Sequence, residues 1–289
     1  MSTLIDDFKM QFRTGDAATR LIMVNVVLFA ISMVIPAIAY LAGRPMSLLY
    51  YVSLSSGLPE LITKPWSPIT YMFFHAGIWH LLVNMLMLYF SSRLFTTFFT
   101  QKQLLGLYLL GGLFAGGIYI LAYLIFPALS SQTAWLVGAS ASVMAILFAA
   151  ASYSPMMEVR LLLLGRVKLW HIALAFLLID LVQLPATNTG GHLSHLGGAL
   201  FGYLYIRALK SGRDWATPVA NLLDVFGPKK KKKTPFKKVY RNPNPVSRPN
   251  VVIKDRTQQQ IDEILDKISK SGYESLTKDE RDFLARGGK

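Results

Sequence analysis

Long apolar stretches, each about as long as a lipid bilayer is thick, constrain the fold of this chain most strongly. An α-helix needs about 20 mostly apolar residues to cross the hydrocarbon core. Within the hydrocarbon core an α-helix also satisfies its own backbone hydrogen bonds, which an open β-sheet cannot do. Six such stretches predict six spans, at Leu21 to about Leu41, Ile69 or Trp79 to Phe95, Leu104 to Phe126, Gly138 to just before Ser154, Leu169 to Leu184, and His192 to Leu209.

Charge separates this apolar body from a polar tail. Charged residues make up 16% of the 289 residues, against roughly 25% in an average soluble domain. Residues 1–206 hold ten Lys or Arg and six Asp or Glu, whereas residues 207–289 hold twenty and ten. Basic residues gather before the first span, between the fourth and fifth, and after the sixth, which predicts that both termini lie in the cytoplasm. There is no cysteine, so thiolate chemistry and disulfides are excluded.

Four segments follow from these patterns. We expect a cytoplasmic N-terminal segment at 1–20, a membrane domain at 21–210, a basic, proline-rich linker at 211–255 and a short helical hairpin at 256–289. In the hairpin, Gly272 is the expected end of a first helix, and Thr277 with Glu280 forms a capping box that opens a second. Seven lysines at 229–238 predict anionic lipid as a partner of the linker. They lack the interleaved aromatic residues of a nucleic-acid site, so nucleic acid is not expected.

Ser140 lies among small residues at the start of the fourth apolar stretch. A serine in a membrane helix usually bonds to a backbone carbonyl or joins two helices. A positioned base would instead activate it as a nucleophile. His195 is the candidate base, because the glycines that follow it let the sixth span approach the fourth closely. The fourth span is short, about 24 Å for sixteen residues, so we expect Ser140 at the bottom of a wet indentation open to the outside.

His80 and Asn84 are four residues apart on the second span and so share one helix face. If each residue is considered separately, the simpler interpretation is that Asn84 links two helices and that His80 is an interfacial residue. In the predicted topology, however, His80, Ser140 and His195 lie at one depth on three different helices. We therefore expect the His80 and Asn84 side chains and the Ser140 backbone N–H to form an oxyanion hole.

These stretches together resemble the rhomboid intramembrane serine proteases. The residues that carry the resemblance are Trp79-His80-x-x-x-Asn84, Gly138-Ala139-Ser140 and His195-Leu196-Gly197-Gly198-x-x-x-Gly202, in that order. The resemblance covers roughly residues 15–210, and Pro65-Trp66 and Gly191 also fit it.

The resemblance implies an all-α membrane protein with the six-transmembrane-helix rhomboid fold, of the bacterial type, followed here by the small helical tail. It implies an endopeptidase of the bacterial inner (plasma) membrane that cleaves transmembrane protein substrates near the outer face. Ser140 and His195 would form a dyad with no third acid, and no cofactor or metal is expected. The chain departs from the family pattern at Ala141, where glycine is usual, and at Met144, where an aromatic residue is common.

Four alternatives remain beside this interpretation. His192 and His195 are three residues apart and could face one metal ion, although no His-Glu-x-x-His motif is present. An aspartyl protease needs two membrane aspartates, and Asp180 is alone, so we interpret it as an interfacial or loop-anchoring residue. A transporter would be expected to show a repeated pair of broken helices. An inactive rhomboid-like scaffold would normally lack the serine or the histidine.

Overall fold

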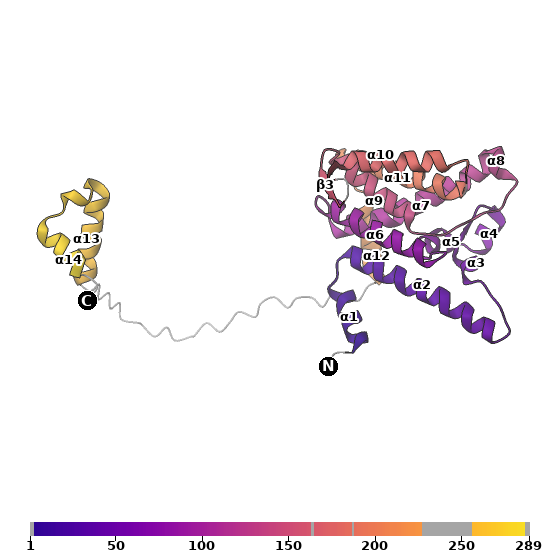
Figure 1. The fold of residues 1–289 in the computed structure, drawn as a ribbon, viewed down its shortest axis with the longest axis horizontal. Helices are drawn as coiled ribbons and strands as arrows, with labels where there is room; N and C mark the ends of the chain where they lie inside the picture. The colour runs from indigo at the N-terminus through magenta and orange to yellow at the C-terminus, as the bar shows by residue number, and fades with distance from the viewer. Residues whose placement is uncertain (1–2, 163–164, 187, 227–255, 287–289) are drawn as a thin grey trace. The chain divides into compact units, whose positions relative to one another are not determined.

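The computed structural model describes residues 3–162, 165–186, 188–226 and 256–286. The chain divides into two compact units, residues 1–229 and 230–289, which are described separately (Figure 1). The lysines at 229–238 and most of the expected linker lie outside the described residues.

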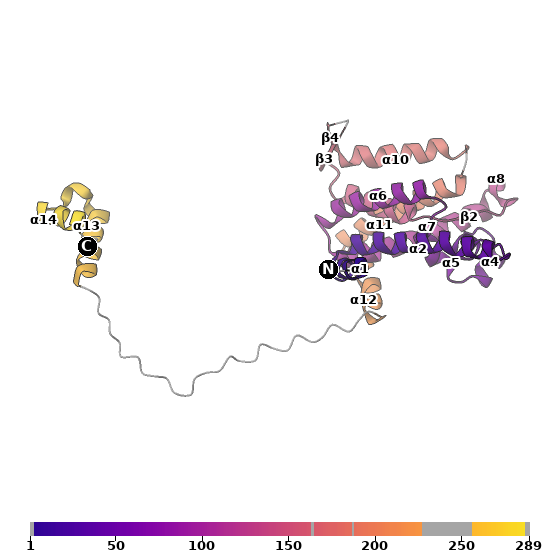
Figure 2. The same ribbon diagram turned by 60° about the horizontal axis from the view of Figure 1, so that its bottom comes forward.

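The first unit contains a helix at each of the six places where an apolar stretch predicts one. Figure 2 shows the axes of α2, α6 and α10 lying nearly parallel across this unit. The six helices are α2 (Ala17–Leu41), α6 (Ile78–Thr96), α7 (Gln101–Ile125), α9 (Ser140–Tyr153), α10 (Leu169–Gln183) and α11 (Thr189–Lys210).

Three of these helices, α2, α6 and α7, are long and apolar enough to cross a membrane. The other two apolar helices are shorter: α9 has 14 residues and α10 has 15. The α11 helix has 22 residues but is rich in glycine and polar side chains. Length and composition therefore identify three candidate spans among the described residues, where the sequence analysis expects six.

The α9 helix is the centre of the first unit. It packs against α6, α7, α10 and α11 (Figure 1), and ten of its fourteen residues are buried. Two glycines of α11 permit the closest approach: a Cβ added at Gly198 would lie 2.1 Å from the Ala141 carbonyl oxygen, and one at Gly202 would lie 2.2 Å from that of Ala145. Because glycine has no side chain, the two backbones can meet at these positions. Small residues commonly permit such close packing between membrane helices.

The segment between α2 and α6 folds into several short elements. Its strand β1 pairs antiparallel with β2, the strand just before α9, so that Leu54 lies opposite Leu136. The Ser56 N–H also donates to the Ala134 carbonyl, at 3.0 Å. This pairing fixes the chain that leads into α9. The elements of this segment are α3 (Leu48–Val52), β1 (Leu54–Ser55), α4 (Leu58–Thr63), α5 (Ser67–Thr70) and the 3₁₀ turn η1 (Tyr71–Phe73). Between α7 and α9 lie α8 (Pro127–Ser130) and β2 (Trp135–Leu136).

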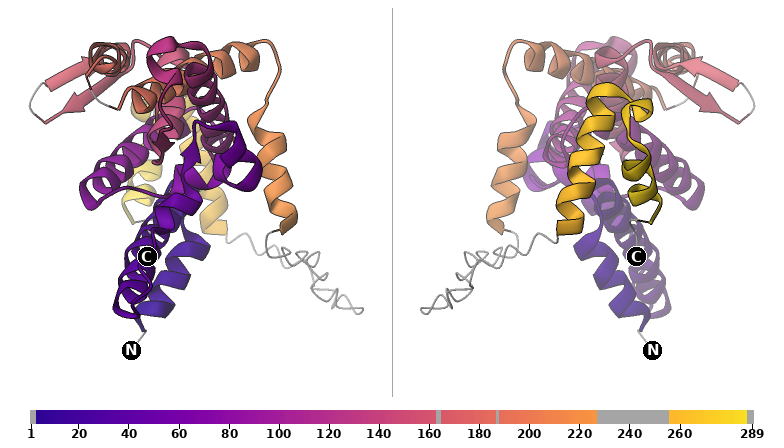
Figure 3. Two further views of the ribbon diagram at one scale, coloured as in Figure 1. Left: turned by 90° about the vertical axis from the view of Figure 1, so that its right-hand side faces the viewer. Right: turned by 90° about the vertical axis from the view of Figure 1, so that its left-hand side faces the viewer.

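Further elements of the first unit that the sequence does not predict are α1 (Leu4–Thr14), the hairpin strands β3 (Glu158–Leu161) and β4 (Gly165–Lys168), and α12 (Ala216–Phe226). Figure 3 shows the hairpin projecting beyond the helices between α9 and α10. The α12 helix packs against α7, so the range 211–255, expected to be linker, begins with a packed helix.

The second unit is a small helical hairpin. It contains α13 (Arg256–Ser271), the 3₁₀ turn η2 (Tyr273–Ser275) and α14 (Lys278–Arg286). Gly272 ends α13 with φ +78°, and the capping box is present because the Thr277 N–H donates to Glu280 Oε2 and the Glu280 N–H to Thr277 Oγ1. Lys267 donates to the same carboxylate at 2.8 Å. These donors lower the pKa of Glu280 to about 2.

Candidate functional site

A cavity of about 570 Å³ lies among α6, α9, α10 and α11. Its walls are largely apolar, formed by residues such as Val83, Met87 and Phe176. Polar side chains converge on it from four helices: His80, Asn84, Ser140, Asp180, His192 and His195. An apolar cavity with a few convergent polar groups is the usual form of a binding or catalytic site.

Ser140 is the first residue of α9. The helix cannot continue back through Gly138, which has φ +133°, a conformation that side chains rarely permit. A Cβ at Gly138 would also lie 2.8 Å from His80 Nε2. As the first helical residue, Ser140 has a backbone N–H with no partner inside the helix.

The Ser140 and His195 side chains meet. Ser140 Oγ lies 2.7 Å from His195 Nε2, within the range of a good hydrogen bond. The contact joins α9 to α11, and it follows from the close approach of these helices at Gly198. The same glycines predict this closeness from the sequence.

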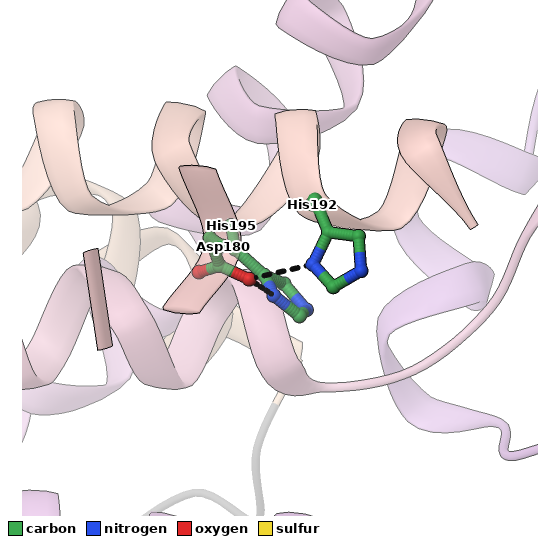
Figure 4. A group of neighbouring side chains, drawn as sticks. All are labelled: Asp180, His192 and His195. Atoms are coloured by element: carbon green, nitrogen blue, oxygen red, sulfur yellow. Dashed lines mark hydrogen bonds and ion pairs between the residues drawn. The ribbon is translucent and has the colours of Figure 1, made fainter. Parts of the chain in front are cut away.

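The opposite nitrogen of His195 meets Asp180. His195 Nδ1 lies 2.9 Å from Asp180 Oδ1, and His192 Nδ1 lies 2.8 Å from the same oxygen (Figure 4). Asp180 is 4% exposed. The interpretation of Asp180 as an interfacial or loop-anchoring residue is therefore wrong. The resemblance implied a dyad with no third acid, whereas the Asp180 carboxylate contacts His195. The position of Asp180 near the end of an apolar helix did not show which face of α10 turns toward α11.

His80 and Asn84 line the same cavity from α6. The Ala76 N–H donates to His80 Nδ1 at 3.4 Å, which leaves the ring proton on Nε2, the nitrogen beside Gly138. Asn84 donates from Nδ2 to the His80 carbonyl oxygen at 2.8 Å. Its buried Oδ1 has no hydrogen-bond partner among the described residues. The amide is thus only partly satisfied within the chain.

His75 is a neighbour of the site that the sequence analysis did not single out. It is fully buried, and its ring packs edge-on against that of His80 with centroids 5.1 Å apart. The Ala139 N–H points to His75 Nε2 at 3.5 Å. His75 thus links the loop before α6 to the residues just before Ser140. Its position five residues before His80 gives no helical spacing from which this contact could be predicted.

The two departures from the family pattern are accommodated. Ala141 lies within α9, and Asn188 is the only described non-glycine residue with positive φ, so position 141 does not require glycine. Met144 is buried and lines the cavity.

Comparison with known proteins identifies the family of this chain. The model of the Rhomboid domain family matches residues 63–211, just over half of the 289 residues. The chain belongs to the rhomboid family. All four helices that line the cavity of this rhomboid protein lie within the matched residues.

One curated relative of this rhomboid protein is Presenilin-associated rhomboid-like protein A, mitochondrial, from Danio rerio. The two are 30% identical over 137 residues, which is 46% of this chain and 35% of that protein. The chain therefore spans about a third of the length of the curated relative it matches. The rhomboid protein also matches, over residues 252–287, a family of unknown function (DUF6576). This second match includes α13 and α14.

Proposed function

We propose that this rhomboid protein is a serine endopeptidase of the membrane interior that hydrolyses membrane-anchored proteins near the outer membrane face. The observation that carries the proposal is the 2.7 Å contact between Ser140 Oγ and His195 Nε2 inside an apolar cavity. Rhomboid proteins are usually serine proteases, and a Ser–His pair is the minimal arrangement for activating a hydroxyl.

Catalysis would follow the chemistry of that pair. Ser140 Oγ attacks the scissile carbonyl carbon while His195 Nε2 accepts its proton. His195 then donates this proton to the leaving amine, and an acyl-enzyme remains on Ser140. Water, deprotonated by the same nitrogen, hydrolyses the ester and returns the serine.

The oxyanion of each tetrahedral intermediate needs donors on the other side of Ser140. The space beside the Gly138 α-carbon supports such a site, because a Cβ there would lie 2.8 Å from His80 Nε2 and 3.7 Å from Ser140 Oγ. We place the oxyanion in this space, held by His80 Nε2–H, the Ser140 backbone N–H and an Asn84 amide hydrogen. Preorganised donors of this kind act where charge develops.

The membrane arrangement is part of the proposal. We infer six spans, with α9, α10 and α11 crossing beside the three longer helices, and both termini in the cytoplasm as the basic residues favour. The membrane would be a bacterial inner membrane. The substrate would be a transmembrane protein whose helix unwinds easily and has small residues near the cleaved bond, because the attacked backbone must be extended.

The first prediction is that Ser140→Ala and His195→Ala each abolish cleavage of a model transmembrane substrate while the protein still folds. A serine-reactive phosphonate or isocoumarin should label the wild-type protein at Ser140, as located by mass spectrometry. Each variant removes one half of the proton-transfer pair, so label and cleavage should disappear together.

Matched controls exist on the same helices. Ser142 lies two residues further along α9, with its hydroxyl 3.9 Å from Met72 Sδ, and His171 is an exposed histidine of α10. Ser142→Ala and His171→Ala should retain labelling and cleavage. Full activity of Ser140→Ala would reject the proposal. A folded wild-type protein that neither cleaves nor takes the label would instead favour an inactive scaffold.

A further inference from the structure

A buried carboxylate shared by two histidines remains outside the proposed Ser–His chemistry. We propose that Asp180 is a positioning residue that holds His195 in the reactive tautomer and orientation, and that His192 holds the carboxylate of Asp180 in place. The inference rests on the proposed function, because it assigns a role toward the same His195.

The hydrogen bonds determine which nitrogen of His195 carries the proton. An ionised carboxylate only accepts hydrogen bonds, so His195 Nδ1, at 2.9 Å from Asp180 Oδ1, must be the donor. Its Nε2 is then free of hydrogen and accepts from the Ser140 hydroxyl at 2.7 Å. Without the carboxylate, the ring could carry its proton on Nε2, where it cannot accept the proton of Ser140.

His192 reaches the same carboxylate oxygen from the same helix. His192 and His195 are three residues apart on α11 and share one face, and both Nδ1 atoms point to Oδ1 of Asp180 (Figure 4). One carboxylate oxygen has two lone pairs and can accept both donors. The two bonds together restrict rotation of the carboxylate and join α10 to α11.

The charge on Asp180 matters during the proton transfer. When the proton of Ser140 moves to Nε2, His195 becomes a cation, and its Nδ1–H still faces the Asp180 anion. The pair is then neutral as a whole. Because Asp180 is buried, such pairing favours the charged intermediate more than it would in bulk solvent. When the proton passes to the leaving amine, His195 returns to its neutral form.

A metal ion is the alternative for these three residues, whose possible ligand atoms lie within 4.8 Å of one another. The distances favour hydrogen bonds. Two ligands at 2.0–2.1 Å from one tetrahedral zinc lie about 3.4 Å apart, whereas each histidine nitrogen lies 2.8 or 2.9 Å from Asp180 Oδ1. His195 also uses its other nitrogen to contact Ser140.

The test measures kcat, KM and the pH dependence of phosphonate labelling at Ser140 in the full-length protein. Asp180→Asn should lower kcat about 100-fold or more, with little change in KM. The acid limb of the labelling rate should move to lower pH by about one unit, because protonated His195 loses its counter-charge. The other titratable groups around the site are His192, His80 across the cavity and His75 behind it.

Conservative variants separate positioning from packing. Asp180→Glu keeps a carboxylate and should recover part of the activity lost in Asp180→Asn, with the acid limb near that of the wild type. His192→Phe removes the second donor and should lower kcat about 3–10-fold, and His192→Gln, which keeps a donor, should lower it less. Ser194→Ala is the control on α11, since its hydroxyl bonds to the Gly191 carbonyl of its own helix at 2.7 Å.

The outcomes distinguish this inference from the proposed function. If the wild type cleaves, Ser140→Ala is inactive and Asp180→Asn keeps the wild-type kcat and acid limb, the role of Asp180 is rejected and the Ser–His pair stands. If Asp180→Asn loses activity only in proportion to its loss of folded protein, a structural role replaces positioning. Inactivation by a chelator with recovery on adding zinc would replace both proposals with the metal site.

Discussion

Ser140 and Ser142 are two residues apart on one helix, and their different partners decide which of them is the candidate nucleophile. Ser140 Oγ contacts an imidazole nitrogen, whereas Ser142 is fully buried beside a thioether. The left-handed backbone at Gly138 places Ser140 at the helix start, where its N–H is free to donate to a ligand. One residue thus supplies the nucleophile and, by the proposal, an oxyanion donor.

At the scale of single residues, we predict the effect of substituting Asn84. Asn84→Asp keeps the shape of the side chain but removes its donors, so it should cost ~2.7–4 kcal/mol of transition-state stabilisation, or about 10²–10³-fold in kcat. KM should change little, because the Nδ2 hydrogen that faces the cavity bonds only to the oxyanion, while the other donates to the His80 carbonyl oxygen within the helix. Steady-state kinetics on a reconstituted substrate measures both constants.

Ser91 offers the control for Asn84 on the same helix. It is fully buried, and its hydroxyl has no hydrogen-bond partner among the described residues, so Ser91→Ala should leave kcat unchanged. If Asn84→Asp, His80→Ala and the double variant all keep the wild-type kcat, neither side chain stabilises the oxyanion.

At the scale of elements, the approach of α11 to α9 sets the geometry of the Ser–His contact. The two helices meet where α11 carries glycine, so that its backbone contacts the Ala141 carbonyl oxygen without an intervening side chain. The α10 helix then closes the other side of His195 through Asp180. The order of these three helices in space makes the arrangement possible.

Gly198→Ala should disturb this approach. The added methyl group would lie 2.1 Å from the Ala141 carbonyl oxygen, so the helices must separate. We expect a loss of about 1–3 kcal/mol in the free energy of unfolding and a slower reaction of Ser140 with the phosphonate. Thermal unfolding in detergent and the labelling rate measure the two effects.

Gly117→Ala is the matched control for Gly198→Ala. Gly117 lies within α7, and a Cβ there would meet nothing within 4 Å. This variant should keep the wild-type melting temperature and labelling rate. Equal behaviour of the two variants would show that close packing at Gly198 does not position His195.

At the scale of the whole molecule, the site belongs to one of the two units. Every residue that lines the cavity lies between Ala76 and His195, within the unit of residues 1–229. The second unit has its own internal contacts, such as the Lys267–Glu280 ion pair at 2.8 Å. Catalysis by the proposed residues therefore needs no atom of the tail, for which we propose a role at anionic lipid.

Truncation after Gly227 should leave cleavage in detergent nearly unchanged. The isolated tail should bind anionic vesicles, because each basic residue near such a surface contributes ~1 kcal/mol of attraction. That binding should weaken as salt is added. Vesicle co-sedimentation at several salt concentrations measures it. A truncated enzyme that is folded but inactive would give the tail a part in catalysis.

Local patterns in the sequence determined where the helices form. Apolar stretches predicted a helix at all six places in the first unit, and Gly272 and the Thr277–Glu280 capping box predicted the ends of the tail helices. These signals depend on neighbouring residues in the chain, so they can be recognised without the fold. Order and spacing of the Ser140, His195, His80 and Asn84 motifs likewise indicated the family.

Only the tertiary structure decided which faces of these helices meet. Asp180 lies in an apolar helix whose pattern has no polar face, so its rotation toward His195 could not be predicted. The start of α9 at Ser140 depends on residues far away in the sequence, since the Gly138 N–H donates to the Tyr71 carbonyl and β2 pairs with β1. Helix formation is governed by near neighbours, whereas a partner for His195 is set by how three separate helices pack.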